Sequence, residues 1–234
     1  MGAKYSVQGF AFIGRTFDEY CKMFHLTENE LQNNTFLDCP GGACSFTAEA
    51  KKKGITAQAS DCEYDKSVSH FEESCQLELD KVRVGFADAK SLFNWSFYGD
   101  LDQLLLYRQK SARLFVQDYY KNPKSYTNGT LPNLPFPDNT FDIVLSGHFL
   151  FLYADRLDYN FHLNALLELT RVAKKEVRVY PLIGLDGSAY ADMNRLLNEL
   201  SQTGAVPKLI QTDFEFLKGS NQCLLIQKDS RNGD

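Results

Sequence analysis

The 234-residue sequence lacks three features, each of which would define a class of protein. No apolar run approaches the roughly 18 to 20 residues that cross a membrane, and the most apolar stretch, at 149–153, is far shorter. No C-x-x-C pair or neighbouring histidine offers the ligand spacing of a zinc site. The formal net charge is −5, so no broad positive field attracts a polyanion. We therefore expect no membrane partner, no metal and no nucleic-acid partner.

The chain also begins without the charged and apolar regions of a secretory signal. Its six cysteines are an even number that would permit disulfides, but without export we expect them to be reduced and mostly buried. With 44% hydrophobic and 24% charged residues, the composition is typical of a globular protein. We expect a cytoplasmic protein, a monomer or homodimer, with a single domain over residues 1–234.

A strand, a turn, a helix and a second strand follow one another closely near residue 40. A short apolar strand is predicted at 35–39, and a Pro-Gly-Gly turn ends it at 40–42. Residues 43–53 predict a helix with its apolar positions on one face, and a second strand follows at 55–59. This spacing is typical of a βαβ unit, whose two strands are parallel and whose crossover is right-handed.

Further elements follow a turn cluster at 134–139. The pattern predicts a strand at 141–145, a helix at about 160–172, a strand at 177–183 and an amphipathic helix that ends at Gly204. Two final strands, at 208–217 and 222–227, are joined by residues 218–221, a loop so short that it indicates an antiparallel hairpin. The predicted sheet is therefore parallel with an antiparallel edge.

The remaining segments are predicted to be mostly helical. Residues 1–34 are interpreted as an N-terminal helical segment, and residues 63–124 as a helical insertion or lid between the second and third strands. Residues 82–86 can also be read as a strand. We prefer a third strand at 126–129, because it lies directly before the turn cluster.

The glycine turn and a nearby acid carry the sharpest chemical signal. Gly41 and Gly42 lie between a strand and a helix, where backbone N–H groups can approach an anionic ligand closely. A tight turn alone would explain these glycines, but Asp61 follows the next strand. A carboxylate at that position accepts hydrogen bonds from ribose hydroxyls, in dinucleotide folds and in adenosyl-cofactor folds alike.

Three stretches carry a resemblance to a known family: FLDCPGGACSF at 36–46, LPFPDNTFDIV at 134–144 and ELTRVA at 168–173. They resemble class I S-adenosylmethionine-dependent methyltransferases, in particular the small-molecule type of ubiquinone biosynthesis and a group of uncharacterised methyltransferase-like proteins. The resemblance implies an α/β, Rossmann-like, doubly wound sheet of seven strands with helices on both faces. It also implies S-adenosylmethionine as the cofactor and an unidentified small molecule as the methyl acceptor.

The resemblance implies a set of residues that bind the cofactor. The first motif departs from the family pattern D-x-G-x-G-x-G, which only Asp38 and Gly42 meet, since Pro40 and Cys44 stand at the outer glycine positions. Thr130 stands where the family has an acid near the adenine. The implied cofactor-binding residues are Asp38, Pro40, Gly41, Gly42, Ser45, Asp61, Cys62, Thr130, Leu131, Ser146, Gly147 and Arg15, the last toward the cofactor carboxylate.

The family mechanism is in-line transfer of the sulfonium methyl group, which requires no metal. His148 follows the fourth predicted strand and is the candidate general base, although a histidine there can equally be structural. Tyr98, Arg108 and Tyr153 are candidate substrate-binding residues. The N/D-P-P-Y/F signature of DNA adenine methylases is absent after the fourth strand, which argues against a nucleic-acid base as acceptor.

Two other functions stay open at this point. A nicotinamide-dependent oxidoreductase would need G-x-G-x-x-G after the first strand, whereas the chain has only Gly41 and Gly42 there. The C-terminal hairpin also has no place in that fold. The second alternative is a module that binds S-adenosylmethionine but has lost catalysis, and it is motivated by Pro40, Cys44 and Thr130.

Overall fold

The structure of the chain is a computed structural model that describes residues 9–228, apart from the side chains of Ala87 and Asp88. The predicted N-terminal segment 1–34 therefore lies partly outside the described residues. At the centre is a seven-stranded sheet in the order β3-β2-β1-β4-β5-β7-β6. The strands are β1 Phe36–Asp38, β2 Ala57–Asp61, β3 Tyr126–Asn128, β4 Phe141–Gly147, β5 Ala173–Tyr180, β6 Ala205–Gln211 and β7 Gln222–Lys228.

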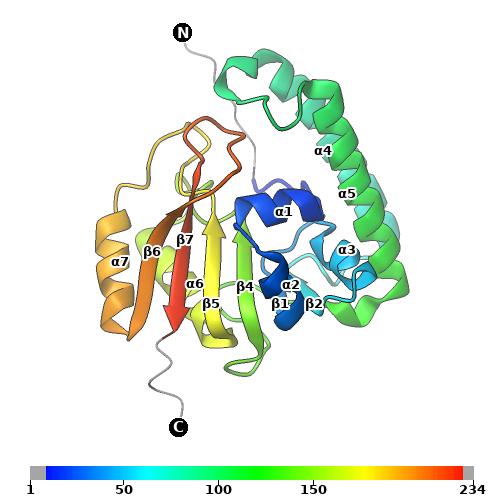
Figure 1. Cartoon of the computed structure of the whole chain (residues 1–234). Helices are drawn as coiled ribbons and strands as arrows, with labels where there is room; N and C mark the ends of the chain where they lie inside the picture. The colour runs from blue at the N-terminus through cyan, green and yellow to red at the C-terminus, as the bar shows by residue number, and fades with distance from the viewer. Residues whose placement is uncertain (1–8, 229–234) are drawn as a thin grey trace.

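The pairing of the strands confirms the predicted fold class. β1 pairs in parallel with β2 and β4, β2 with β3, and β4 with β5. β7 runs antiparallel to both of its neighbours, β5 and β6. Figure 1 shows β4 and β5 pointing toward the end of the sheet where the long β6–β7 loop also lies. The carboxyl ends of the parallel strands thus share one edge.

Helices cover both faces of the sheet. On one face α6 packs on β4 and β5 and α7 packs on β6, in one core cluster with Leu37 and Val144. On the other face α1 and α3 share a core cluster with Phe36 and Ile143. The long α4 and α5 pack against each other beside the β2 and β3 side of the sheet (Figure 1). The helices are α1 Phe17–Met23, α2 Glu28–Asn33, α3 Phe46–Lys52, α4 Val68–Asp88, α5 Leu101–Lys121, α6 Tyr159–Val172 and α7 Met193–Gln202.

Several predicted boundaries change. The strand predicted at 208–217 ends at Gln211, so the loop to β7 covers 212–221 and is longer than expected. The reason is that Phe214 and Phe216 are buried against aromatic side chains of the segment 86–98 instead of extending the sheet. This loop brings C-terminal side chains to the carboxyl edge of the sheet.

The other differences are smaller. The helix predicted from residue 43 begins at Phe46, because the turn continues through Cys44. Residues 82–86 are helical within α4, so the strand reading of that segment is wrong, and β3 confirms the preferred alternative. The strand predicted at 177–183 runs over Ala173–Tyr180. In the part of the chain that the structure describes, none of the helices has the length and apolar character needed to cross a membrane.

Candidate active site

A cavity of about 730 Å³ lies at the carboxyl ends of β1, β2, β4 and β5. This volume is within the range of small-molecule sites, and the edge is the one at which open α/β sheets bind their ligands. Its wall includes residues from almost the whole described chain, from Phe10 near the N-terminus to Ser220 before β7. The cavity is therefore a product of the complete fold.

The glycine turn forms one side of this cavity, and its backbone is held by the protein itself. The Gly41 N–H donates to the Ser60 carbonyl at 2.9 Å and the Gly42 N–H to Asp61 Oδ2 at 2.9 Å. The Tyr64 hydroxyl donates to the Gly42 carbonyl at 2.7 Å. The expectation that these two N–H groups receive an anionic ligand is therefore wrong, because both already have acceptors. A ligand can still approach the backbone of the turn closely, because Gly42 has no side chain.

Two buried carboxyl groups flank the turn. Asp61 ends β2 and lines the cavity, and its Oδ1 accepts the Glu63 N–H at 3.0 Å. Asp38 ends β1 beneath the turn, where its Oδ1 accepts the Tyr20 hydroxyl at 2.8 Å. Burial raises the pKa of both carboxyls, that of Asp38 well above its ordinary value. Asp61 can thus meet a ligand, whereas Asp38 acts on the cavity through Tyr20, which lines it.

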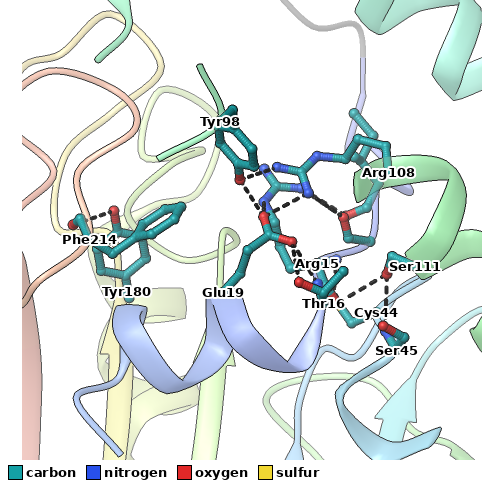
Figure 2. Close-up of polar contacts among 12 residues, drawn as sticks. Arg15, Thr16, Glu19, Cys44, Ser45, Tyr98, Arg108, Ser111, Tyr180 and Phe214 are labelled. Carbon is teal, nitrogen blue, oxygen red and sulfur yellow. Dashed lines mark hydrogen bonds and ion pairs between the residues drawn. The ribbon is translucent and has the colours of Figure 1, made fainter. Parts of the chain in front are cut away.

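Glu19 of α1 organises a buried polar cluster beside the turn (Figure 2). Its carboxylate accepts Arg108 Nη1 at 2.7 Å and the Thr16 N–H at 2.7 Å, and it also accepts the Tyr98 hydroxyl. Arg15 Nε lies 3.7 Å from the same carboxylate. Burial acts to raise the pKa of Glu19, but the charges of Arg108 and Arg15 outweigh it and lower the pKa.

This cluster carries one more positive than negative charge, because one carboxylate faces two guanidinium groups. Both Arg15 and Arg108 line the cavity. Arg15 Nε is buried and has no hydrogen-bond partner among residues 9–228. The backbone of Arg15 is bonded to the segment that follows the glycine turn. The Arg15 N–H donates to Cys44 Sγ at 3.3 Å, and the Arg15 carbonyl accepts the Ser45 N–H at 3.0 Å. An anionic group of a ligand would complete this end of the cavity.

His148 lies directly after β4, in the left-handed region with φ +54°. Its N–H donates to the Tyr180 carbonyl at 2.6 Å, and its imidazole lines the cavity. The ring makes no hydrogen bond to any other described residue. Burial, with the charges of Arg15 and Arg108, holds the pKa of His148 well below its usual value. The imidazole is therefore neutral at neutral pH and can accept a proton.

The candidate site residues divide into two groups by position. Asp38, Ser45, Ser146 and Tyr98 are buried behind the cavity wall. Ser45 Oγ donates to Glu49 at 2.6 Å, and Tyr98 belongs to the Glu19 cluster. The others line the cavity: Arg15, Pro40, Gly41, Gly42, Asp61, Cys62, Arg108, Thr130, Leu131, Gly147, His148 and Tyr153.

Sequence reasoning missed several residues that shape the site. Glu19 gives a partial signal, since Thr16 and Glu19 form a capping box that predicts the start of α1. Nothing local indicates its pairing with Arg108, which is 89 positions away. Tyr64, which donates to the Gly42 carbonyl, and Phe216, which lines the cavity, give no signal at all, because the position of each depends on the whole fold. Within the described residues, no histidine, cysteine, aspartate and glutamate side chains gather as a metal ion would require.

Comparison with known proteins connects this geometry to a family. A family model described as a methyltransferase domain matches residues 104–180. The uncharacterized protein MJ0045 of Methanocaldococcus jannaschii is 36% identical over 217 residues, which cover 92% of this chain and 95% of that protein. The chain belongs to the same family as this uncharacterized archaeal protein, and its residues 104–180 match a methyltransferase domain.

Solved structures similar to this chain include two methyltransferases. One is magnesium protoporphyrin IX methyltransferase from Synechocystis, with bound S-adenosylmethionine; it has a TM-score of 0.46 and 11% identity over 86% of this chain and 73% of that one. The other is a SAM-dependent methyltransferase from Aquifex aeolicus, with a TM-score of 0.44 and 15% identity over 89% of this chain and 91% of that one.

Proposed function

We propose that the chain transfers a methyl group from S-adenosylmethionine to a small molecule. The observation that carries the proposal is that Asp61 and Arg15 both line one cavity at the carboxyl edge of the sheet, together with the glycine turn. A carboxylate and an incompletely neutralised guanidinium complement the ribose hydroxyls and the carboxylate of this cofactor.

The residues that line the cavity suit the parts of the cofactor. Asp61 would accept hydrogen bonds from the ribose, Arg15 would bind the carboxylate, and Thr130 and Leu131 would lie beside the adenine. Because Gly42 has no side chain, the turn would leave room for the part of the cofactor that joins its ribose to its carboxylate. S-adenosylmethionine supplies an electrophilic methyl group, and the protein contributes proximity and orientation. His148 holds an unprotonated imidazole beside Gly147 for the proton of the acceptor.

The glycine turn also distinguishes this cofactor from a dinucleotide. A pyrophosphate is bound by free backbone N–H groups at the turn and at the first turn of the following helix. Here the N–H groups of Gly41 and Gly42 donate within the protein, and the Ser45 N–H donates to the Arg15 carbonyl. The turn therefore favours a ligand without phosphate, and the nicotinamide alternative has no support in the geometry.

Calorimetric titration with S-adenosylhomocysteine tests the proposal. We expect the wild type to bind it and not NAD, and we expect Asp61→Ala to lose about 1–3 kcal/mol of binding free energy, since a buried hydrogen-bond acceptor is removed. The matched control is Asp65→Ala, because Asp65 is an exposed acid four positions further along that does not line the cavity. Failure of the wild type to bind S-adenosylhomocysteine, or equal losses in the two variants, would overturn the proposal.

A further inference from the structure

One part of the cavity wall is made of aromatic rings. Phe86 of α4, Phe93 after it and Phe216 of the β6–β7 loop all line the cavity. Their rings are stacked, with centroids 4.4 Å apart for Phe86 and Phe93 and 4.7 Å apart for Phe93 and Phe216. We call these three residues the aromatic wall. The segments that carry it are distant in sequence, so the wall depends on the long loop at 212–221.

Charged groups that line the cavity are held in ion pairs or lie at the glycine turn. Lys81 lies 2.6 Å from Glu78 on the same helix. Arg108 is bound to Glu19, and Asp61 and Arg15 lie at the glycine turn, where the proposed cofactor uses them. An ionised group placed against the aromatic wall would therefore be buried without a counter-charge, which is strongly unfavourable.

Polar groups near the wall are few, and they are mostly satisfied. The Tyr180 hydroxyl and Ser220 Oγ are 2.9 Å apart and form a hydrogen bond with each other. The His148 ring lies edge-on to the Tyr180 ring, with centroids 5.5 Å apart. Its imidazole is the polar group here that lacks a hydrogen-bond partner in the described chain. A ligand in this compartment therefore meets flat apolar surfaces and one neutral acceptor of a proton.

We propose that the methyl acceptor is an uncharged aromatic molecule with one weakly acidic ring hydroxyl, seated between the aromatic wall and His148. The assignment rests on the proposed function. Flat rings gain most from stacking and edge contacts with other rings, and a phenolic hydroxyl satisfies the unpaired imidazole. In the transfer, the hydroxyl proton passes to the His148 imidazole while an oxygen electron pair forms the O–CH₃ bond. The S–CH₃ bond breaks, its electrons remain on sulfur, and the imidazolium returns the proton to water.

Two naphthalene derivatives of the same shape test the charge of the acceptor. The probes are 2-naphthol, which has a neutral weakly acidic hydroxyl, and 2-naphthoate, which has a carboxylate. Titration is followed by calorimetry with S-adenosylhomocysteine present at saturation. We expect 2-naphthol to bind at least ten-fold more tightly than 2-naphthoate.

A pair of conservative variants tests the position. Phe216→Leu removes a ring of the aromatic wall but keeps an apolar side chain, so the fold is preserved and 2-naphthol affinity falls at least five-fold. Phe12→Leu is the matched control, because Phe12 lines the cavity but stacks on Phe71 of α4, away from the wall. Affinity for S-adenosylhomocysteine stays within two-fold of wild type in the Phe216→Leu variant.

The outcomes separate this inference from the function on which it rests. If S-adenosylhomocysteine binds but 2-naphthoate matches 2-naphthol, or if the two variants have equal 2-naphthol affinity, the acceptor class is wrong and the cofactor assignment stands. If S-adenosylhomocysteine does not bind, the proposed function itself is overturned, whatever the naphthalene probes do.

Discussion

Replacing Glu19 by glutamine will test whether the buried cluster beside the glycine turn stabilises the fold through charge. The substitution keeps the shape of the side chain but leaves the guanidiniums of Arg15 and Arg108 without their shared carboxylate. Removal of one partner from a buried ion pair costs about 3–5 kcal/mol, because the other charge stays buried and uncompensated. For a chain of this size, that loss lowers the midpoint of thermal unfolding by roughly 6–20 °C.

Urea denaturation followed by circular dichroism measures this loss of unfolding free energy. Glu73→Gln is the matched control, since Glu73 is an exposed residue of α4 and its replacement should change stability by less than about 0.5 kcal/mol. The double variant Glu19→Gln with Arg108→Met should be more stable than the sum of the single losses predicts, because the stranded charge of Arg108 is gone. A loss below about 1 kcal/mol for Glu19→Gln would refute the reasoning.

The same variant makes a prediction about pH. The pKa of Glu19 is lower in the folded chain than its ordinary value, because the neighbouring arginines outweigh the effect of burial. Its ionised form therefore contributes stability that is present above the unfolded pKa of about 4.3 and is lost as pH falls through the folded pKa. The unfolding free energy of the wild type should fall as the pH is lowered through this window. In the Glu19→Gln variant, the unfolding free energy should depend less on pH.

The remaining predictions concern the cavity itself. Arg15→Met should weaken S-adenosylhomocysteine binding about ten-fold and leave 5′-methylthioadenosine, which has no carboxylate, unaffected; equal losses for the two ligands would exclude a contact with the carboxylate. The NMR chemical shifts of the His148 ring protons should stay constant between pH 8 and pH 6, because the pKa of His148 is held well below its ordinary value. A titration midpoint near pH 6.5 would contradict this. Gly42→Ala should cost about 1–2 kcal/mol in urea denaturation, since φ is +51° while no atom within 4 Å obstructs the added methyl group; an unchanged stability would mean that the turn relaxes.

The fold was largely predictable because its signals are local. The βαβ unit that contains the glycine turn and the reversed C-terminal strand each follow from residues close together in sequence, and their strands pair in the sheet as predicted. The error at 208–217 has a tertiary cause. Phe214 and Phe216 continue a strand-like pattern, but burial against the segment 86–98 takes them out of the sheet.

The position of the candidate site was predictable from its strand ends. Asp61 and the glycine turn were identified for that reason, and both line the cavity. The hydrogen bond from Tyr64 to Gly42 and the pairing of Glu19 with Arg108 join segments that no periodicity relates. Tyr98, predicted as a substrate-binding residue, does not line the cavity and bonds to Arg108 from behind its wall.

The wall of the cavity runs from Phe10 to Ser220, and this has a practical consequence. The residues that line the cavity come together only in the folded chain, so a molecule that occupies the cavity binds the native chain and not the unfolded one. Ligand at one hundred times its dissociation constant then adds about 2.7 kcal/mol to the unfolding free energy. In a chain of this length the melting temperature rises by roughly 5–11 °C. Heat resistance alone can therefore rank a library of unlabelled acceptor candidates, before any product of the reaction has been seen.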